Sequence, residues 1–166
     1  MQPVLRRTWG PRGCRPVLQQ SQRHDRLSLA SALAVSPRRR RVSLYWHSQR
    51  RNIRACDLVA FLRQLRRHIR RNLVLVLDRW SVHRARAVRH WHERCGESVV
   101  LEWLPPYAPE LNPVEQVWDH SKYSDLANFC PGSADHLEFR VGISLCKQSE
   151  RHSLLRSFFD AANLPL

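Results

Sequence analysis

LVLVLD, at residues 73–78, says more about the class of fold than any other part of this sequence. Its first five residues are all apolar and two are β-branched, which predicts a central strand buried on both faces of a sheet. The strand is expected to end at Asp78. Because ligands of open α/β sheets bind at the carboxyl ends of strands, Asp78 is the first candidate site residue.

Helical periodicity flanks this strand on both sides. Residues 55–71 predict one helix, with Asp57 in the first turn, where a carboxylate suits the helix dipole. Residues 83–95 predict a second helix with Ser81 as its N-cap, and residues 98–104 predict a further strand. A helix between two strands predicts a parallel crossover. The apolar positions are Leu58, Leu62, Leu65 and Ile69 in the first helix, and Ala87, Val88, Trp91 and Cys95 in the second.

A hairpin is predicted before this unit. Residues 26–36 form a compact apolar strand, residues 36–39 a turn, and residues 42–47 a second strand. The expected fold is therefore α/β, a mixed sheet flanked by helices. The length of 166 residues suits one domain or a large piece of one. The segment from residue 132 to residue 148 has a helical pattern that Gly142 is expected to interrupt.

Net charge indicates the class of partner. The chain has 28 Lys and Arg residues against 14 Asp and Glu residues, a net charge of +14, and 26 of the cations are arginine. The planar guanidinium matches phosphate oxygens in pairs, so a polyanion such as DNA is the expected partner. A coding bias toward arginine explains the Arg/Lys ratio but not the charge excess. The 43% of hydrophobic residues argues against wholesale disorder.

The predicted helix at residues 55–71 concentrates this charge on one face. Its like-charged pairs at i,i+4 each cost about 0.2–0.5 kcal/mol in an isolated helix, whereas a solvated face usually mixes signs. This face is therefore expected to bind an anion. The alternative is a solvent-exposed basic face that has no ligand and whose charge repulsion the fold tolerates. The arginines that we assign to DNA binding are Arg63, Arg66, Arg67, Arg70 and Arg71, together with Arg79 and Arg84 after the strand.

Cysteines and histidines give no metal signature. The five cysteines are widely spaced, odd in number and without a C-x-x-C pair, which favours reduced thiols. His90 and His92 would lie about 200° apart on a helix, so they cannot share a ligand face. No apolar run approaches the length of a membrane span, and the N-terminus lacks a signal-peptide pattern. We expect a cytoplasmic, nucleoid-associated protein without membrane contact.

Glu115 is the second candidate carboxylate. Asn112, Pro113 and Glu115 stand in the order of an N-cap, a first helical position and a third helical position. The same pattern fits a capping box, in which Glu115 only closes a helix end. Asp78 also has a purely structural alternative, in which it only caps the strand end or forms the turn after it.

Two motifs together carry a family resemblance. Residues 77–83 (LDRWSVH) and 104–118 (LPPYAPELNPVEQVW) resemble the catalytic core of DDE-type transposases, in the bacterial insertion-sequence branch of the mariner-like superfamily. Weaker similarity extends over residues 6–9, 29–33, 125–129 and 153–159. The resemblance implies an RNase H-like fold in which three carboxylates hold two Mg²⁺ or Mn²⁺ ions for DNA strand cleavage and strand transfer.

The resemblance also assigns roles to residues. It makes Asp78 the second and Glu115 the third catalytic, metal-binding carboxylate. His83 matches an auxiliary histidine that orients phosphate or a neighbouring carboxylate, Asn112 matches a helix cap, and Trp118 matches a packing anchor. Arg79 and Trp80 are bulkier than the residues expected after the second carboxylate, and either line the DNA path or narrow the site.

The first carboxylate has no good match. The resemblance places it on a strand upstream of residues 6–9, while Asp25 and Asp57 fit a turn residue and a helix-dipole residue better. Residues 1–166 are therefore expected to be a partial catalytic domain without the first strand and the N-terminal helix-turn-helix region, inactive alone. Alternatives are a non-catalytic DNA-binding remnant, a regulator of a full-length transposase, or a half that an upstream-frame product completes. Formation of a homodimer is a further alternative.

Overall fold

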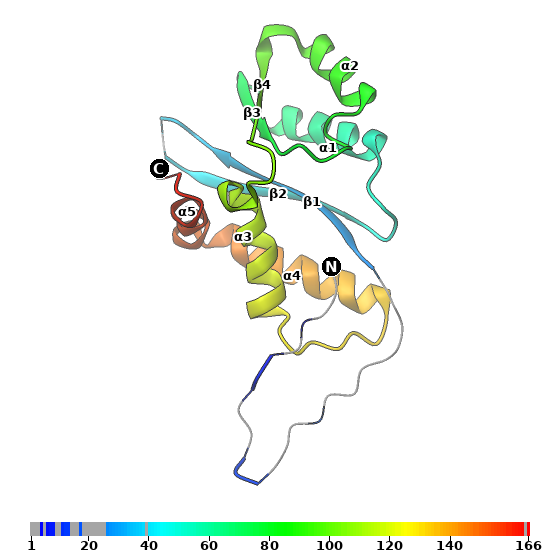
Figure 1. Cartoon of the computed structure of the whole chain (residues 1–166), viewed down its shortest axis with the longest axis vertical. Coiled ribbons are helices and arrows are strands. Elements are labelled where there is room, and N and C mark those ends of the chain that lie inside the picture. The colour runs from blue at the N-terminus through cyan, green and yellow to red at the C-terminus, as the bar shows by residue number, and fades with distance from the viewer. Residues whose placement is uncertain are drawn as a thin grey trace.

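The computed structural model describes residues 4, 6–8, 11–13, 17, 26–38, 40–164 and 166. Over these residues a long β-hairpin crosses the middle of the molecule, with one group of helices on each side (Figure 1). Helices α3, α4 and α5 lie on one side, and α1 and α2 lie on the other with strands β3 and β4. The predictions that concern Trp9, Cys14, Asp25 and Arg39 lie outside the described residues.

The predicted hairpin is confirmed. Strand β1 (Ser28–Val35) pairs antiparallel with β2 (Val42–Gln49), with Val35 opposite Val42 next to the turn. The side chains of β1 alternate between two apolar clusters, as the pleat requires. Leu29 and Leu33 pack toward α3–α5, and the smaller Ala30 and Ala32 pack toward α1. Both faces of the hairpin therefore pack against helices.

Three helices cover the first face. They are α3 (Pro113–His120), α4 (Ala134–Glu150) and α5 (His152–Ala161), and a π-helical turn at Ser121–Asp125 joins α3 to the following loop. Val117, Leu145 and Leu155 are fully buried in the cluster that these helices form with the hairpin. The expected interruption at Gly142 is wrong, since α4 runs through it and a Cβ there would meet nothing within 4 Å.

The second face is covered by the unit that contains the LVLVL run. It comprises α1 (Ala55–His68), β3 (Leu73–Leu77), α2 (Arg86–Cys95) and β4 (Val99–Trp103). Strand β3 pairs parallel with β4, which confirms the predicted crossover. Leu58, Leu62 and Leu65 are buried as predicted, but Ile69 lies just beyond α1, whose end the Arg66 guanidinium caps by donating to the Ile69 carbonyl at 2.8 Å.

The second helix begins later than predicted. Helix α2 starts at Arg86, residues 81–84 form turns, and the N-cap is Ala85, so the assignment of Ser81 as a cap is wrong. The cause is local, because the backbone N–H groups of His83 and Arg84 both bond to the Trp80 carbonyl. This turn wraps the chain around Asp78 before the helix can start. Ala87, expected on the apolar side, is exposed, whereas Val88 and Trp91 are buried.

The prediction that β3 is buried on both faces is also wrong. Val74 and Val76 are 67% and 53% exposed, and only the opposite face of β3 packs against α1 and α2. The described strands form two separate two-stranded sheets, β1–β2 and β3–β4, in place of one continuous mixed sheet. No strand among the described residues lies between β1 and β3, so the edge of each strand that faces the other is unpaired.

Cys56, Cys95, Cys130 and Cys146 are free thiols, in agreement with the prediction for these four. Among the described residues, no helix has both the length and the apolar character that crossing a membrane requires.

Candidate active site

One cavity is lined by all four residues that were predicted to have catalytic or auxiliary roles. Asp78, His83, Asn112 and Glu115 all line a cavity of about 2360 Å³ that runs between the hairpin and β3. Asp78 comes directly after β3 and Glu115 lies in the first turn of α3, so the two carboxylates approach from different elements. Two carboxylates with 36 residues between them in the sequence thus share one space, as the resemblance implied.

Asp78 is held in place by its own turn. The Nδ1 atom of His83 lies 2.6 Å from Oδ1 of Asp78, and the backbone N–H of Trp80 donates to the same oxygen at 2.9 Å. The hydrogen bond from His83 is the main cause that lowers the pKa of Asp78 below its ordinary value, with burial acting in the opposite direction. The other oxygen, Oδ2, has no hydrogen-bond partner among the described residues. Asp78 is therefore ionised and oriented, with one oxygen free.

The side chain of Glu115, unlike that of Asp78, is not held by hydrogen bonds to described residues. The side chain of Asn112 caps α3 by accepting from the N–H of Val114 at 3.2 Å, and the Glu115 carboxylate forms no hydrogen bond or ion pair with any described residue. The capping-box alternative for Glu115 is therefore wrong. Burial is the main cause that raises the pKa of Glu115; Lys122 opposes it, and the charges of Asp119 and Asp78 add to it. The result is a half-buried carboxylate that is free to bind a cation.

Two contacts fix the helix that carries Glu115. The indole N–H of Trp118 donates to Oγ of Ser31 on β1 at 3.2 Å, which makes Trp118 the packing anchor that was predicted. Just after α3, Oγ of Ser121 lies 2.9 Å from Oγ of Ser144, and Gln148 donates to Ser121 at 2.7 Å. These three residues are buried, so the end of α3 is bound firmly to α4.

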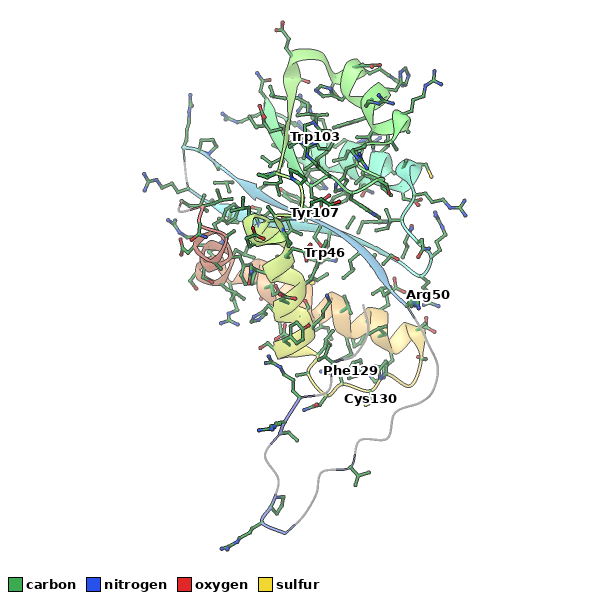
Figure 2. All side chains as sticks on the ribbon, viewed as in Figure 1. Trp46, Arg50, Trp103, Tyr107, Phe129 and Cys130 are labelled. Carbon is green, nitrogen blue, oxygen red and sulfur yellow. The ribbon has the colours of Figure 1, made fainter. Side chains whose placement is uncertain are left out.

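The loop between β4 and α3 adds an aromatic residue that sequence reasoning did not select. Tyr107 is fully exposed, lines the cavity and has a backbone φ of 57°, a left-handed conformation that is unusual for a residue other than glycine. Figure 2 shows it where this loop meets the hairpin. The Leu104 N–H donates to the Leu77 carbonyl at 2.9 Å, which ties the start of the loop to the end of β3. The Pro-Pro-Tyr order predicted a loop, but not this backbone strain.

The predicted DNA-binding arginines fall into two groups. Arg71, Arg79 and Arg84 line the cavity. The other four do not: Arg63, Arg67 and Arg70 are exposed on or just after α1, and Arg66 is engaged at the end of that helix. The cavity is also lined by two hairpin arginines that were not among the predicted site residues, Arg38 and Arg41.

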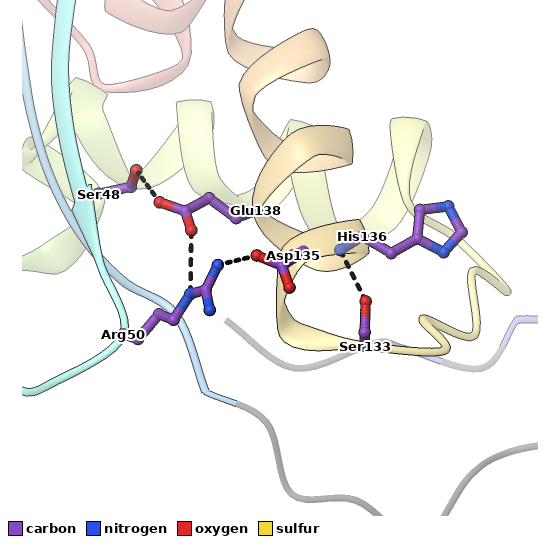
Figure 3. A network of polar contacts seen from close by, with 6 residues as sticks. All are labelled: Ser48, Arg50, Ser133, Asp135, His136 and Glu138. Atoms are coloured by element: carbon purple, nitrogen blue, oxygen red, sulfur yellow. Dashed lines mark hydrogen bonds and ion pairs between the residues drawn. The ribbon is translucent and has the colours of Figure 1, made fainter.

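Three other carboxylates, those of Asp135, Glu138 and Asp57, already have partners. At the start of α4, the guanidinium of Arg50 bonds to both Asp135 and Glu138, and Ser48 donates to Glu138 at 3.3 Å (Figure 3). This network joins the end of β2 to α4. Asp57 receives two hydrogen bonds from Arg51, at 2.6 and 2.7 Å, and these are the main cause of a pKa far below its ordinary value.

Asp57 therefore acts at the N-terminus of α1, as predicted, and not as a first catalytic carboxylate. Its Oδ2 atom also accepts from the backbone N–H of Arg54 at 2.9 Å. Among the described residues no group of three or more His, Cys, Asp or Glu side chains is placed to hold a metal ion. The two carboxylates of the cavity are hard oxygen donors of the kind that Mg²⁺ and Mn²⁺ prefer.

Comparison with known proteins identifies the family. Residues 1–135 match the family model of the DDE superfamily endonucleases, and the chain belongs to this family. No individually curated protein has significant similarity to the sequence.

Solved structures identify the fold. The mariner Mos1 paired-end complexes with Mn and with Mg match at TM-scores of 0.60 and 0.59 and 16% identity. A Mos1 transposase paired-end complex with the left transposon end matches at 0.60 and 17%. These matches cover 97–98% of this chain but only 48–49% of the Mos1 chains, so the chain spans about half the length of these relatives. The predicted RNase H-like α/β fold is confirmed as that of the Mos1 catalytic domain.

The different environments of the two carboxylates predict opposite effects on stability. The pKa of Asp78 is lowered from 3.8, so its ionised form stabilises the fold at about pH 7, and this contribution is lost as the pH falls through the lower folded value. The pKa of Glu115 is raised from 4.5, so folding is favoured by its protonated form, and that contribution is lost as the pH rises through the higher folded value.

Asp78→Asn is therefore expected to lower the free energy of unfolding at about pH 7 and Glu115→Gln to raise it, with both differences shrinking at about pH 3. Urea unfolding of the two variants measures this. A loss of stability in Glu115→Gln at about pH 7 would show that this side chain serves the helix terminus instead.

Proposed function

We propose that this chain is the catalytic portion of a DDE transposase that cleaves and transfers DNA strands during transposition. One observation carries the proposal: Glu115, whose carboxylate has no hydrogen-bond or ion-pair partner among the described residues, shares a cavity with the oriented carboxylate of Asp78. The bacterial insertion-sequence branch and a cytoplasmic, nucleoid-associated location are part of the same proposal. They follow from the sequence resemblance.

The residues of the cavity suit divalent metal chemistry. Asp78 offers one free oxygen and Glu115 offers both, and the Mos1 complexes with Mn and Mg support these cations as the metals. Asp78 and Glu115 would hold such ions, which would supply activation of the attacking oxygen and charge stabilisation of the leaving oxygen at phosphate. His83 holds Asp78 ionised and in one orientation, and Asn112 fixes the helix terminus from which Glu115 projects. Arg71, Arg79 and Arg84 line the same cavity, which supports the proposal that they bind DNA phosphates.

We also propose that residues 1–166 are not a complete active domain. Asp78 and Glu115 supply two of the three carboxylates that the family uses, and Asp57 is committed to Arg51. The third carboxylate, with the first strand and a helix-turn-helix region, is proposed to come from a longer polypeptide or from an upstream-frame product. The match to half of the Mos1 length supports this division.

A cleavage assay tests this account. The chain alone is expected to leave DNA that carries the element's ends uncut in Mg²⁺ or Mn²⁺, because two carboxylates do not position two ions. Robust cutting that is abolished by both Asp78→Asn and Glu115→Gln would contradict the proposed incompleteness. The coding DNA just upstream of Met1 gives a second check, since it is expected to encode a strand ending in an Asp, preceded by a helix-turn-helix.

The alternative function is a non-catalytic DNA-binding protein or a regulator that competes with full-length transposase. A specific observation favours it: the exposed arginines of α1 do not line the cavity, so they are available to DNA whether or not chemistry occurs. A regulator of this kind would bind the same DNA ends as the full-length protein.

DNA affinity is expected to depend on the arginines of α1 and not on Asp78. Replacing Arg63, Arg67 and Arg70 by Ala together should weaken binding and reduce the slope of log K against log salt by about 0.9 for each DNA phosphate that the variant no longer neutralises. Asp78→Ala should leave the affinity unchanged or raised. Fluorescence anisotropy over a salt series measures both.

A matched control removes the same charge from the opposite side of the molecule. Arg140, Lys147 and Arg151 lie exposed on α4 or at its C-cap, so replacing them by Ala changes net charge equally. An equal reduction of the slope in both triple variants would show that affinity follows net charge alone.

A further inference from the structure

Two aromatic side chains are exposed in the cavity that contains the candidate carboxylates. Tyr107 is fully exposed and Trp80 is 44% exposed, and both line the cavity. The ring of Trp80 contacts the ring of His83. Otherwise neither side chain has a hydrogen bond or a ring contact with any described residue. Aromatic rings carry a large apolar surface, so these two offer contact area to a ligand.

The two rings belong to the same edge of one sheet. Strands β3 and β4 are parallel and end opposite each other, and Trp80 comes shortly after β3 and Tyr107 shortly after β4. Two hydrogen bonds join the connections that follow these strands. The Leu104 N–H donates to the Leu77 carbonyl at 2.9 Å, and Nε of Arg79 donates to the Leu104 carbonyl at 3.3 Å. Both aromatic residues therefore lie at the edge of the sheet that carries the first candidate carboxylate.

The local backbone fixes the position of each ring. The N–H of Trp80 donates to Oδ1 of Asp78 at 2.9 Å, and the Trp80 carbonyl accepts from the N–H of His83 at 3.0 Å. The rings of Trp80 and His83 are nearly perpendicular, with centroids 5.4 Å apart. Tyr107 has a φ of 57°, and strained backbone of this kind clusters at sites that bind ligands. The fold thus holds both rings in the cavity instead of burying them.

The charges beside the rings indicate the class of ligand. Arg79 and Arg84 are exposed and line the same cavity, and neither forms an ion pair with a carboxylate among the described residues. Arginines beside exposed aromatic rings are the combination by which proteins bind single-stranded nucleic acid, since the cations neutralise phosphates and the rings stack on bases. In an intact duplex the bases are already stacked on one another and leave nothing for such rings to stack on.

We infer that Trp80 and Tyr107 form a stacking site for unpaired bases, so that the chain binds a DNA strand that is locally separated from its complement beside the candidate carboxylates. This inference rests on the proposed function for the identity of the polymer and adds the state of the strand. It also assigns a role to Trp80, for which the sequence left two alternatives. The ring lines the path of the DNA and does not merely narrow the site.

Fluorescence of the base analogue 2-aminopurine tests the inference, because stacking quenches its emission. The whole chain is titrated in EDTA, without divalent metal, into two duplexes of equal length that carry 2-aminopurine at the centre. One duplex is fully paired and the other has a short run of mismatches around the analogue, so both carry the same charge. The mismatched duplex is expected to bind at least about fivefold more tightly and to lose emission on binding.

Variants of the two rings separate stacking from folding. Trp80→Leu and Tyr107→Asn remove the rings, and asparagine tolerates the left-handed backbone of residue 107. Each is expected to weaken binding of the mismatched duplex by at least about fivefold and to leave binding of the paired duplex unchanged. Trp80→Phe and Tyr107→Phe keep a ring and should retain the preference. Phe139→Leu is the matched control, since Phe139 is 67% exposed on α4 and does not line the cavity.

Equal affinity for the two duplexes, or quenching that persists in both ring-removal variants, would overturn the inference. So would an equal loss of preference in Phe139→Leu, or in the phenylalanine variants, because the preference would then not depend on these two rings as stacking surfaces. In each of these cases the paired duplex is still bound, and the proposed function stands. Failure of the chain to bind either duplex would contradict the proposed function itself, and the inference with it.

Discussion

The two-sided packing of the β1–β2 hairpin is the constraint on which the rest of the structure depends. Large side chains of β1, Leu29 and Leu33, face α3–α5, and small ones, Ala30 and Ala32, face α1. A slip of one residue would turn the leucines toward α1 and the alanines toward α3–α5. The register beside the turn, with Val35 opposite Val42, therefore determines how both helical layers pack.

The position of the candidate site follows from this register. Ser31 lies on the same face of β1 as the leucines, where its Oγ accepts from Trp118 and fixes α3. Glu115 is three residues before Trp118, so both side chains project from the same face of α3 toward the cavity that they line. Asp78 reaches this cavity from the end of β3. The hairpin thus determines where one carboxylate lies, and the β3–β4 unit where the other lies.

Much of this fold could be predicted because periodicity records which face of an element is buried. The hairpin, the Leu58-Leu62-Leu65 stripe and the end of β3 at Asp78 all follow from local pattern, as does the Asn112 cap. The start of α2 could not be predicted, because His83 and Trp80 bond to the Asp78 carboxylate and delay the helix. No propensity scale includes that competition.

Two further features depend on information that the local sequence does not contain. The LVLVL run predicts a strand that is buried on both faces, yet Val74 and Val76 are exposed. Burial of the second face depends on a neighbouring element, and the described residues supply none there. The Asn-Pro-Val-Glu order is the same whether Glu115 caps α3 or stays unbonded. Only the three-dimensional arrangement distinguishes these two cases, because within the part of the chain that the structure describes the Glu115 carboxylate has no bonding partner.

The most direct test of the account is where a paramagnetic metal binds. Mn²⁺ added to the isotopically labelled chain is expected to broaden the backbone NMR signals of residues 78–83 and 113–117 first, and the double variant Asp78→Asn/Glu115→Gln should lose this effect. Broadening centred on Asp135 and Glu138, or unchanged broadening in the double variant, would contradict the claim that Asp78 and Glu115 form the metal-binding pair.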